Sequence, residues 1–188
     1  MKTKELVLCA LFATLIMVGA FIRIPIPVIP FTLQFLFTNL AGLLLGKKLG
    51  CISVGVYILA GLAGAPVFTA GGGIGYIFYP TFGYLIGFLF GAYFAGRIVE
   101  GTEQPSFKLA LAAGGVNLAV VYLFGIAYYY MIANYYLGGA SSIGAWALVL
   151  HGFVIVVPGD ILICFASAAI LRRMNLILEG RVWGARRS

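Results

Sequence analysis

The chain of 188 residues is 63% hydrophobic and only 9% charged, with a mean hydropathy of +1.09. Soluble domains carry about 25% charged residues, so this inventory cannot cover a water-facing surface and excludes a soluble globular protein. A net charge of +7 would suggest a nucleic-acid partner in a soluble protein, but here the basic residues lie at the ends of apolar runs, where they anchor membrane helices. The sequence therefore predicts one integral membrane domain over residues 1–188 with no nucleic-acid partner; we exclude the polar tail 181–188 from the interpretation.

Charges, prolines and glycines divide the chain into six units that we expect to cross the lipid bilayer. In chain order these are about 5–22, 31–46, 49–63, 80–96 and 109–131, followed by a last unit in which an apolar stretch, 143–157, is broken at Pro158-Gly159 and continues as a helix to Leu171. The sequence thus predicts an all-α membrane protein with six transmembrane helices.

Several of these spans are too short, because crossing a bilayer takes about 20 helical residues. The missing length must come from three irregular segments, 23–30, 64–79 and 138–159, which all fall on the same side of the membrane. Non-helical backbone at membrane depth survives only where it is buried in protein or lines a cavity. We therefore expect a cavity that opens toward that side.

The basic residues predict the orientation. If both termini are cytoplasmic, all of the 12 basic residues except Arg23 lie inside, namely Lys2, Lys4, Lys47, Lys48, Arg97, Lys108, Arg172, Arg173, Arg181, Arg186 and Arg187. The positive-inside rule favours this arrangement over its inverse. We expect a multi-pass protein of the cell membrane whose irregular segments face outward.

Asp160 is the only aspartate in the chain, and no formal charge occurs between Leu109 and Gly159 or between Ile161 and Leu171. A carboxylate inside such apolar sequence is costly to bury, so intramembrane acids usually face a cavity or a partner. Asp160 is therefore the first candidate for a functional residue.

Helical rise predicts the depth of this acid and of three other polar residues. Asp160 lies 12 residues from Arg172, and Gln34, Tyr84 and Tyr122 lie 13 or 14 residues from the inner basic residue of their own span. At about 1.5 Å per residue, all four are roughly 18–21 Å above the cytoplasmic boundary. They are expected to share one level just beyond the midplane.

The most unusual stretch, 66–76, contains four glycines within five positions, Gly71, Gly72, Gly73 and Gly75. Glycine backbone can turn left-handed and lets a ligand approach the main chain closely, and successive N–H groups can cradle an anion. A flexible outer loop is the alternative, but apolar flanks and a position between two short spans favour a folded lid. A phosphate-binding loop is disfavoured, since the run lacks a Gly-Lys-Ser/Thr ending.

Small residues recur every four positions on several spans, a pattern that lets membrane helices approach closely. We expect packing roles for the repeats on the second and fourth spans, Gly42, Gly46, Gly83, Gly87 and Gly91. On the first span, the pairs Cys9/Ala13 and Ala10/Thr14 fit internal packing and partner docking equally well. Asn117 is expected to form an interhelical hydrogen bond.

Neither a metal site nor a disulfide is expected. Cys9, Cys51 and Cys164 are odd in number and lie inside apolar helices, where cysteine packs as a small apolar residue. His151 is the only histidine, with no second ligand residue nearby.

Five motifs occur in order along nearly the whole chain, at fitting distances from the predicted spans. They are PFTLQ at 30–34, GAPVFTAGGGIGY at 64–76, PTFGYLIG at 80–87, VYLFG at 121–125 and PGD at 158–160. Each is weak alone, but the ordered set is specific. Together they resemble the BioY family, the biotin-binding S components of energy-coupling factor (ECF) vitamin transporters.

The resemblance implies a six-helix S component that captures biotin outside the cell and delivers it with a transmembrane T component and two ABC-type ATPases. The chain has no Walker motif, so ATP would be used by those partners, and no cofactor is expected here. The family docks through small residues four apart on its first helix, which favours docking by Ala10, Ala13 and Thr14. Alanine is usual at both positions of the Ala10/Thr14 pair, so Thr14 is a mild departure.

The resemblance also suggests how biotin would bind. Asp160 would accept hydrogen bonds from the ureido N–H groups, with Gln34 beside it. The glycines Gly71, Gly72, Gly73 and Gly75 would close over the ligand and offer N–H groups to its carboxylate tail. The walls would come from aromatic side chains, Phe31, Tyr76, Tyr84 and Tyr122.

One position departs from the family pattern. Family members commonly carry a lysine three residues after the aspartate, and this chain has Ile163 there. Asp160 is thus left without an obvious positive partner and the biotin tail without an obvious cation. Arg23 in the outer loop is the alternative cation; otherwise the glycine backbone does that work, or affinity or substrate preference differs.

Three other functions are alternatives to biotin capture. An S component for a different small vitamin stays open. An intramembrane serine protease using Ser142 and His151 is disfavoured, because no Gly-x-Ser-x-Gly or oxyanion-type motif surrounds Ser142. A channel that uses the glycine run as a filter would need symmetric oligomerisation, for which a single run is no support.

Overall fold

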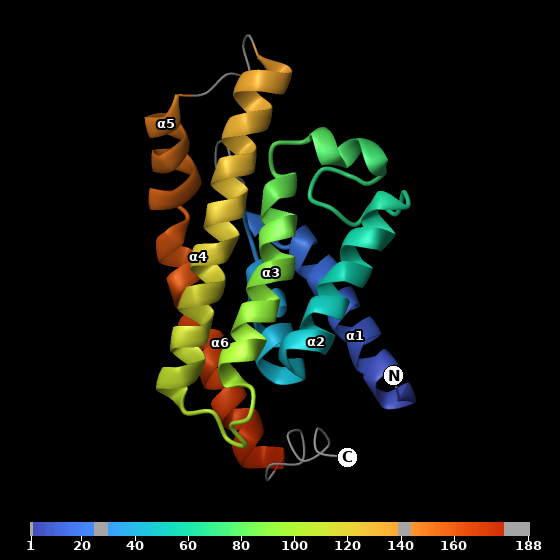
Figure 1. Cartoon of the computed structure of the whole chain (residues 1–188), viewed down its shortest axis with the longest axis vertical. Helices are drawn as coiled ribbons and strands as arrows, with labels where there is room; N and C mark the ends of the chain where they lie inside the picture. The colour runs from blue at the N-terminus through green and yellow to red at the C-terminus, as the bar shows by residue number, and fades with distance from the viewer. Residues whose placement is uncertain (1, 25–29, 139–143, 179–188) are drawn as a thin grey trace.

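The structure is a computed structural model that describes residues 2–24, 30–138 and 144–178. Five of its helices are long and apolar enough to cross a membrane (Figure 1). They are α1 (Thr3–Phe21), α2 (Gln34–Leu62), α3 (Phe82–Val99), the run Phe107–Leu137, which contains α4 (Phe107–Met131), and the run Trp146–Met174, which contains most of α6 (Val157–Leu178). The predicted all-α membrane class is thereby confirmed.

Short elements connect these helices. A two-stranded antiparallel ladder joins β1 (Arg23–Ile24) to β2 (Phe31–Thr32), and a 3₁₀ turn, η1 (Ile74–Phe78), closes the glycine-rich loop, residues 64–79. Beyond α4 come two π-helical segments and a short helix, η2 (Ile132–Leu137), α5 (Ala145–Val149) and η4 (Leu150–Val154).

The last of the three segments predicted to be irregular is largely helical. The chain is helical from Ala145 to Val154, and the turn falls at Ile155 and Val156. Pro158 therefore lies in the first turn of α6 rather than breaking a helix, since the first turn of a helix needs no N–H from proline. The helix also continues to Leu178, beyond the predicted end at Leu171.

The element labelled α2 contains a reversal at Gly46. This glycine has φ 80° and ψ 179°, outside the helical region, and the chain folds back so that Gly50 lies against Ala41 and Gly42. Figure 1 shows the two arms of this hairpin, and α3 packs beside it. The predicted spans 31–46 and 49–63 correspond to these two arms.

Replacing Gly46 with alanine is expected to destabilise the protein. A residue with a Cβ atom is strained by about 1–3 kcal/mol at this φ and ψ, and the melting temperature falls by about 2–4 °C per kcal/mol for a chain of this size. A thermal melt in detergent should show a Tm lower by several degrees. The control is Gly115→Ala, on an exposed part of α4 with nothing within 4 Å of the added methyl group, which should leave Tm unchanged or raise it slightly. Equal melting of the two variants would contradict strain at Gly46.

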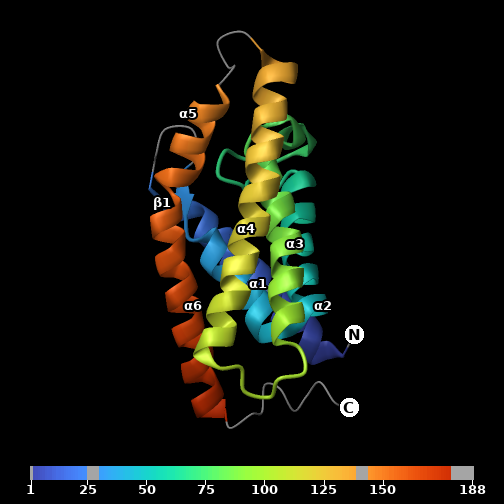
Figure 2. The same cartoon turned by 60° about the vertical axis from the view of Figure 1, so that its left-hand side comes forward.

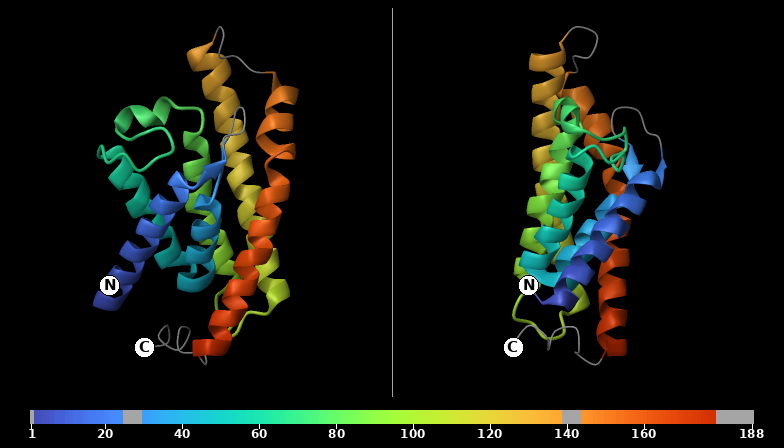
Figure 3. Two further views of the ribbon diagram at one scale, coloured as in Figure 1. Left: turned by 180° about the vertical axis from the view of Figure 1, so that it is seen from behind. Right: turned by 90° about the vertical axis from the view of Figure 1, so that its right-hand side faces the viewer.

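Glycines allow the helices to touch backbone to backbone. Gly87 lies against the main chain of Val121 on α4, and Gly42 lies against that of Ala92 on α3. Added methyl groups would collide at both positions, so the packing role predicted for Gly42 and Gly87 is confirmed, whereas Gly46 makes the reversal within α2. Figure 2 shows α3 between α2 and α4, with α6 against the far side of α4, and Figure 3 shows α1 crossing α2 on the outside of the bundle.

A fully buried polar network joins three helices below the level of Asp160. Asn117 Nδ2 on α4 donates to Asn39 Oδ1 on α2 over 3.0 Å, and Asn39 Nδ2 donates to Ser167 Oγ on α6 over 2.7 Å. The Ser167 hydroxyl in turn donates to the Ile163 carbonyl at 2.8 Å. All three polar side chains are 0% exposed. The interhelical role predicted for Asn117 is confirmed.

Candidate functional site

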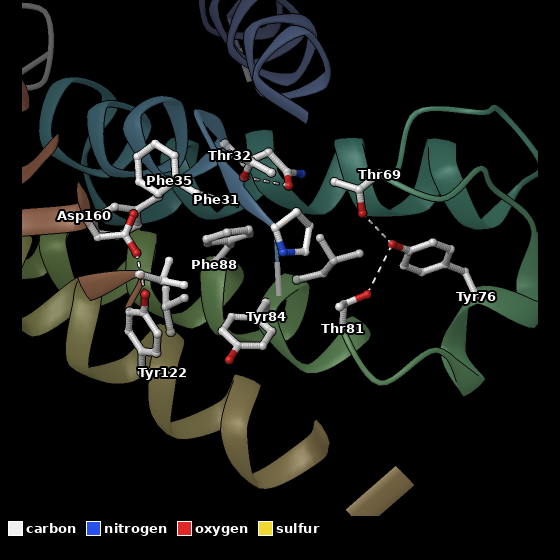
Figure 4. Close-up of a pocket in the computed structure, with 15 residues that line it drawn as sticks. Phe31, Thr32, Phe35, Thr69, Tyr76, Thr81, Tyr84, Phe88, Tyr122 and Asp160 are labelled. Atoms are coloured by element: carbon white, nitrogen blue, oxygen red, sulfur yellow. Dashed lines mark hydrogen bonds between the residues drawn. The ribbon is translucent and has the colours of Figure 1, made fainter. Parts of the chain in front are cut away.

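A cavity of about 610 Å³, part of it open to solvent, lies between the helices and the glycine-rich loop. Figure 4 shows its lining, which combines aromatic and aliphatic walls with a few polar groups. The lining residues are Pro30, Phe31, Thr32, Gln34, Phe35, Thr69, Tyr76, Thr81, Tyr84, Leu85, Phe88, Val121, Tyr122, Val156 and Asp160.

Asp160 marks one end of the cavity. It lies in the first turn of α6, is only 7% exposed, and accepts a hydrogen bond of 2.6 Å from the Tyr122 hydroxyl to its Oδ2. A helix N-terminus favours a nearby carboxylate. Within the described residues no ion pair reaches Asp160, and its remaining acceptor positions are therefore available to a donor in the cavity.

Gln34 is oriented by neighbours on both sides. Its Nε2 donates to the Tyr57 hydroxyl at 2.7 Å, and its Oε1 accepts from the Thr32 hydroxyl at 3.3 Å. Tyr57 then donates to the Val67 carbonyl at 3.2 Å, which ties α2 to the glycine-rich loop. The side chain is 4% exposed, so its direction is set by these bonds rather than by solvent.

The walls between the polar ends are aromatic. Tyr84 and Tyr122 meet edge to face with ring centroids 6.0 Å apart, and Phe153 meets Tyr122 at 5.1 Å. Two glycines make room for these rings, since Gly125 lies against the ring of Tyr84 and Gly159 against that of Phe31. Such faces suit an apolar ring system.

The opposite end of the cavity carries three hydroxyl groups. The Tyr76 hydroxyl lies 3.0 Å from Thr69 Oγ1 and 3.4 Å from Thr81 Oγ1. Figure 4 shows this group facing the cavity from the side opposite Asp160 and Tyr122, with Tyr84 and Phe88 between them. The cavity is thus polar at both ends and apolar in the middle.

Six of the predicted site residues are brought together here. Gln34, Tyr84, Tyr122 and Asp160, which share one predicted depth, all line the cavity, as do Phe31 and Tyr76. Counting helical rise from the inner charges therefore identified side chains from four helical segments that meet in space.

The four glycines of the loop differ from expectation, since Gly71, Gly72, Gly73 and Gly75 are not among the lining residues. Their role in this structure is to fold the loop. Gly71 and Gly73 adopt positive φ angles of 118° and 100°, and their N–H groups donate to carbonyls of Phe68 and Gly61 rather than to the cavity. The loop is the folded segment predicted, but it lines the cavity with Thr69 and Tyr76 instead.

Arg23 also lies outside the lining. It is exposed on β1, and its Nη1 donates to the main-chain carbonyl of Thr69 at 2.5 Å. The guanidinium group therefore bridges β1 to the glycine-rich loop instead of entering the cavity. A direct contact between Arg23 and a ligand is not supported by this geometry.

Removing the Arg23 side chain should accordingly have a small effect on ligand binding. For the biotin ligand that the resemblance implies, we expect Arg23→Ala to lower affinity less than about fivefold, because an exposed group that holds one loop contact contributes about 1 kcal/mol or less. Isothermal titration calorimetry in detergent checks this, with Lys4→Ala as the control that removes an exposed charge elsewhere. A loss above about thirtyfold in Arg23→Ala alone would show that the guanidinium contacts the ligand.

Sequence reasoning missed several lining residues. Thr32, Thr69 and Thr81 lie on a strand, a loop and the residue before α3, where no periodic pattern points to a common site. Phe35, Leu85, Phe88 and Val121 are apolar residues one or a few positions from predicted ones, and in a chain this apolar they carry no separate signal.

The three residues predicted to dock a partner on α1 differ in their exposure. Ala10 and Thr14 are exposed, and the Thr14 hydroxyl donates back to the Ala10 carbonyl at 2.9 Å, which leaves a smooth surface. Ala13 is only 2% exposed and packs in the core, so its inclusion in a docking surface was wrong. The small residues of α1 therefore lie on two faces of the helix, one buried in the core and one exposed.

The protease alternative named two further residues. Ser142 lies outside the described residues, and His151 lies in η4. Within the described part of the chain, no group of three or more His, Cys, Asp or Glu residues could hold a metal ion.

The fold and the cavity define a helical membrane protein with an internal site for a small molecule that is apolar in the middle and polar at its ends. A family model described as the BioY family matches residues 1–180. The chain belongs to the BioY family.

Similar proteins cover nearly the whole chain. A probable biotin transporter BioY of Lysinibacillus sphaericus is 45% identical over 95% of this chain and 90% of its own length, and the biotin transporter BioY of Thermotoga maritima is 36% identical over 92% and 96%. A solved structure of the S-component for biotin from an ECF-type ABC transporter has a TM-score of 0.67 and 30% identity, covering 93% of this chain and 92% of its own. The fold is therefore that of an ECF S component.

Proposed function

We propose that this chain binds biotin in the cavity and serves as the substrate-binding component of a biotin uptake system, a transporter component and not an enzyme. The observation that carries the proposal is the pairing of Asp160 with Tyr122 at the end of an otherwise apolar cavity. The relatives named as biotin transporters and the biotin S-component structure support the choice of ligand.

The chemistry of biotin suits this site. Its ureido ring carries two N–H donors and one carbonyl, and its thiophane ring and chain are apolar. Asp160 offers acceptor positions that Tyr122 leaves unused, and a charge-assisted hydrogen bond is strong in a dry site. Aromatic faces from Phe31, Tyr84 and Tyr122 suit the bicyclic ring.

The two arms of the α2 hairpin count as separate spans in this proposal, which makes six spans with both termini in the cytoplasm of a cell-membrane protein. The start of α1, the reversal of α2, the α3–α4 connection and the end of α6 lie at one end of the bundle (Figures 1 and 2). Lys47 and Arg97 at that end pair with Glu100 at 2.8 and 3.4 Å. Basic residues gathered at one end support a cytoplasmic location.

Partners are required in this proposal, because the chain carries no Walker motif for ATP hydrolysis. We infer that a transmembrane T component and two ABC-type ATPases supply the energy, and the chain itself uses no cofactor. The exposed Ala10 and Thr14 on α1 support docking there, since small residues let helices approach closely.

A thermal-shift screen against water-soluble vitamins tests the proposed function. A ligand that binds only the folded protein adds about 2.7 kcal/mol of stability at a concentration of 100 Kd. Biotin should raise the Tm of the purified protein by several degrees, and thiamine, riboflavin and folate should not. A shift with another vitamin and none with biotin would overturn the assignment.

A further inference from the structure

The hydroxyl groups of Thr69, Tyr76 and Thr81, named here the hydroxyl cluster, have more donors than they use among themselves. Three hydroxyl groups carry three hydrogen-bond protons, and the contacts at 3.0 and 3.4 Å consume two of them. At least one proton is left, and rotation of the hydroxyls can turn all three toward a ligand acceptor. The cluster is therefore a donor-rich site.

Thr81 has an additional feature. It occupies the position before the first residue of α3, where a threonine side chain usually accepts a hydrogen bond from the helix backbone. Within the described chain its side chain makes no such bond and instead faces Tyr76 and the cavity. The N-terminal end of the 18-residue helix α3, which favours negative charge, thus lies beside the cluster.

The two ends of the cavity are opposite in hydrogen-bonding character. An ionised Asp160 only accepts hydrogen bonds, whereas the hydroxyl cluster can donate them. A ligand carboxylate near Asp160 would also meet a like charge in a medium of low dielectric constant. A ligand with donors at one end and an acidic tail therefore has one favourable orientation, with its tail at the hydroxyl cluster.

We propose that the hydroxyl cluster is the subsite for the ligand's acceptor tail, and that it holds this tail through neutral hydroxyl groups rather than through a cation. The inference rests on the proposed biotin function, in which the tail is the valeryl carboxylate. Because a hydroxyl also donates to an uncharged carbonyl, the site accepts tails in which the carboxylate has become an amide. Arg23 contributes by holding the main chain of Thr69 in place.

Calorimetry with three ligands tests the subsite: biotin, biotin amide, and an analogue whose terminal carboxylate is replaced by a methyl group. Thr69→Val, Tyr76→Phe and Thr81→Val should each weaken biotin binding about tenfold and change binding of the methyl analogue less than twofold. Biotin amide should bind the unmodified protein within about tenfold of biotin. The matched controls are Thr38→Val, a buried threonine bonded to the Phe35 carbonyl, and Tyr79→Phe, whose ring stacks on Tyr76.

The possible outcomes separate the tail subsite from the proposed biotin function. Equal losses for biotin and the methyl analogue would mean that the variants only perturb the fold, and would overturn the tail subsite while leaving biotin binding intact. A loss above about a hundredfold for biotin amide in the unmodified protein would overturn the neutral-hydroxyl mode in favour of a cation. No binding of biotin by the unmodified protein would overturn the proposed function itself. Tm values of the variants without ligand identify any that fail to fold, and the remaining variants then decide.

Discussion

Asp160→Asn is expected to weaken biotin binding about a hundredfold. The substitution keeps the volume of the side chain but replaces one acceptor oxygen by an NH₂ group, which would face the ureido donors of the ligand. Hydrogen bonds to charged groups contribute about 1.5–3 kcal/mol, and a hundredfold loss corresponds to about 2.7 kcal/mol. Isothermal titration calorimetry of the purified variant in detergent gives the affinity directly.

Stability without ligand separates this effect from unfolding. Asp160 is almost fully buried with Tyr122 as its hydrogen-bond donor and no ion pair among the described residues, so removing its charge should not lower Tm. Glu100→Gln is the control. It removes a carboxylate at the far end of α3, about 24 Å of helical rise from the cavity at Tyr84, and should leave affinity unchanged. If the affinity of Asp160→Asn for biotin stays within threefold of that of the unmodified protein, Asp160 does not bind the ligand as proposed.

The part of the site that lies on helices could be predicted from the sequence. A helix advances a constant distance per residue, so residues counted from the inner charges have a known depth, and Gln34, Tyr122 and Asp160 meet as counted. The depth alone does not say which side a residue faces. The side that a residue faces was predicted from energy, because it is costly to expose a carboxylate or an amide to lipid.

The part of the site that lies on loops could not be predicted in the same way. Thr81 precedes α3, and Thr69 reaches the cavity from the glycine-rich loop, which folds back over α2 with Gly73 N–H bonded to the Gly61 carbonyl at 2.7 Å. The glycines were predicted to contact the ligand, yet their conformational freedom serves to make the turn. A loop's composition predicts that it bends, while the direction of the bend depends on contacts distant in sequence.

The fold was predicted at the level of its spans but not of its polar interior. Asn117 stood out because it interrupts a long uncharged span, but its partners Asn39 and Ser167 did not. The three residues lie on α2, α4 and α6, far apart in sequence. Only the packing of those helices brings them within hydrogen-bond distance.

Asn39→Ala should be the most destabilising of the polar substitutions. Hydrogen bonds between membrane helices contribute only about 0.6 kcal/mol on average, so the two lost bonds alone would cost little. The larger cost comes from Asn117. Its Oδ1 already has no partner among the described residues, and without Asn39 its Nδ2 loses the one recorded bond. An unsatisfied buried polar group costs about 1–3 kcal/mol, and a cavity adds to this.

The expected result is a Tm lower by roughly 5–10 °C in a detergent melt, at about 2–4 °C per kcal/mol. Ser167→Ala should cost less, because it leaves only Asn39 Nδ2 without an acceptor while the Asn39–Asn117 bond remains. Asn134→Ala is the control, a partly exposed asparagine bonded to the Tyr130 carbonyl, and should change Tm little. The double variant Asn39→Ala/Asn117→Ala decides between the two sources of the cost: if the unsatisfied amide dominates, removing it restores part of the lost stability, and a purely additive loss would contradict this account.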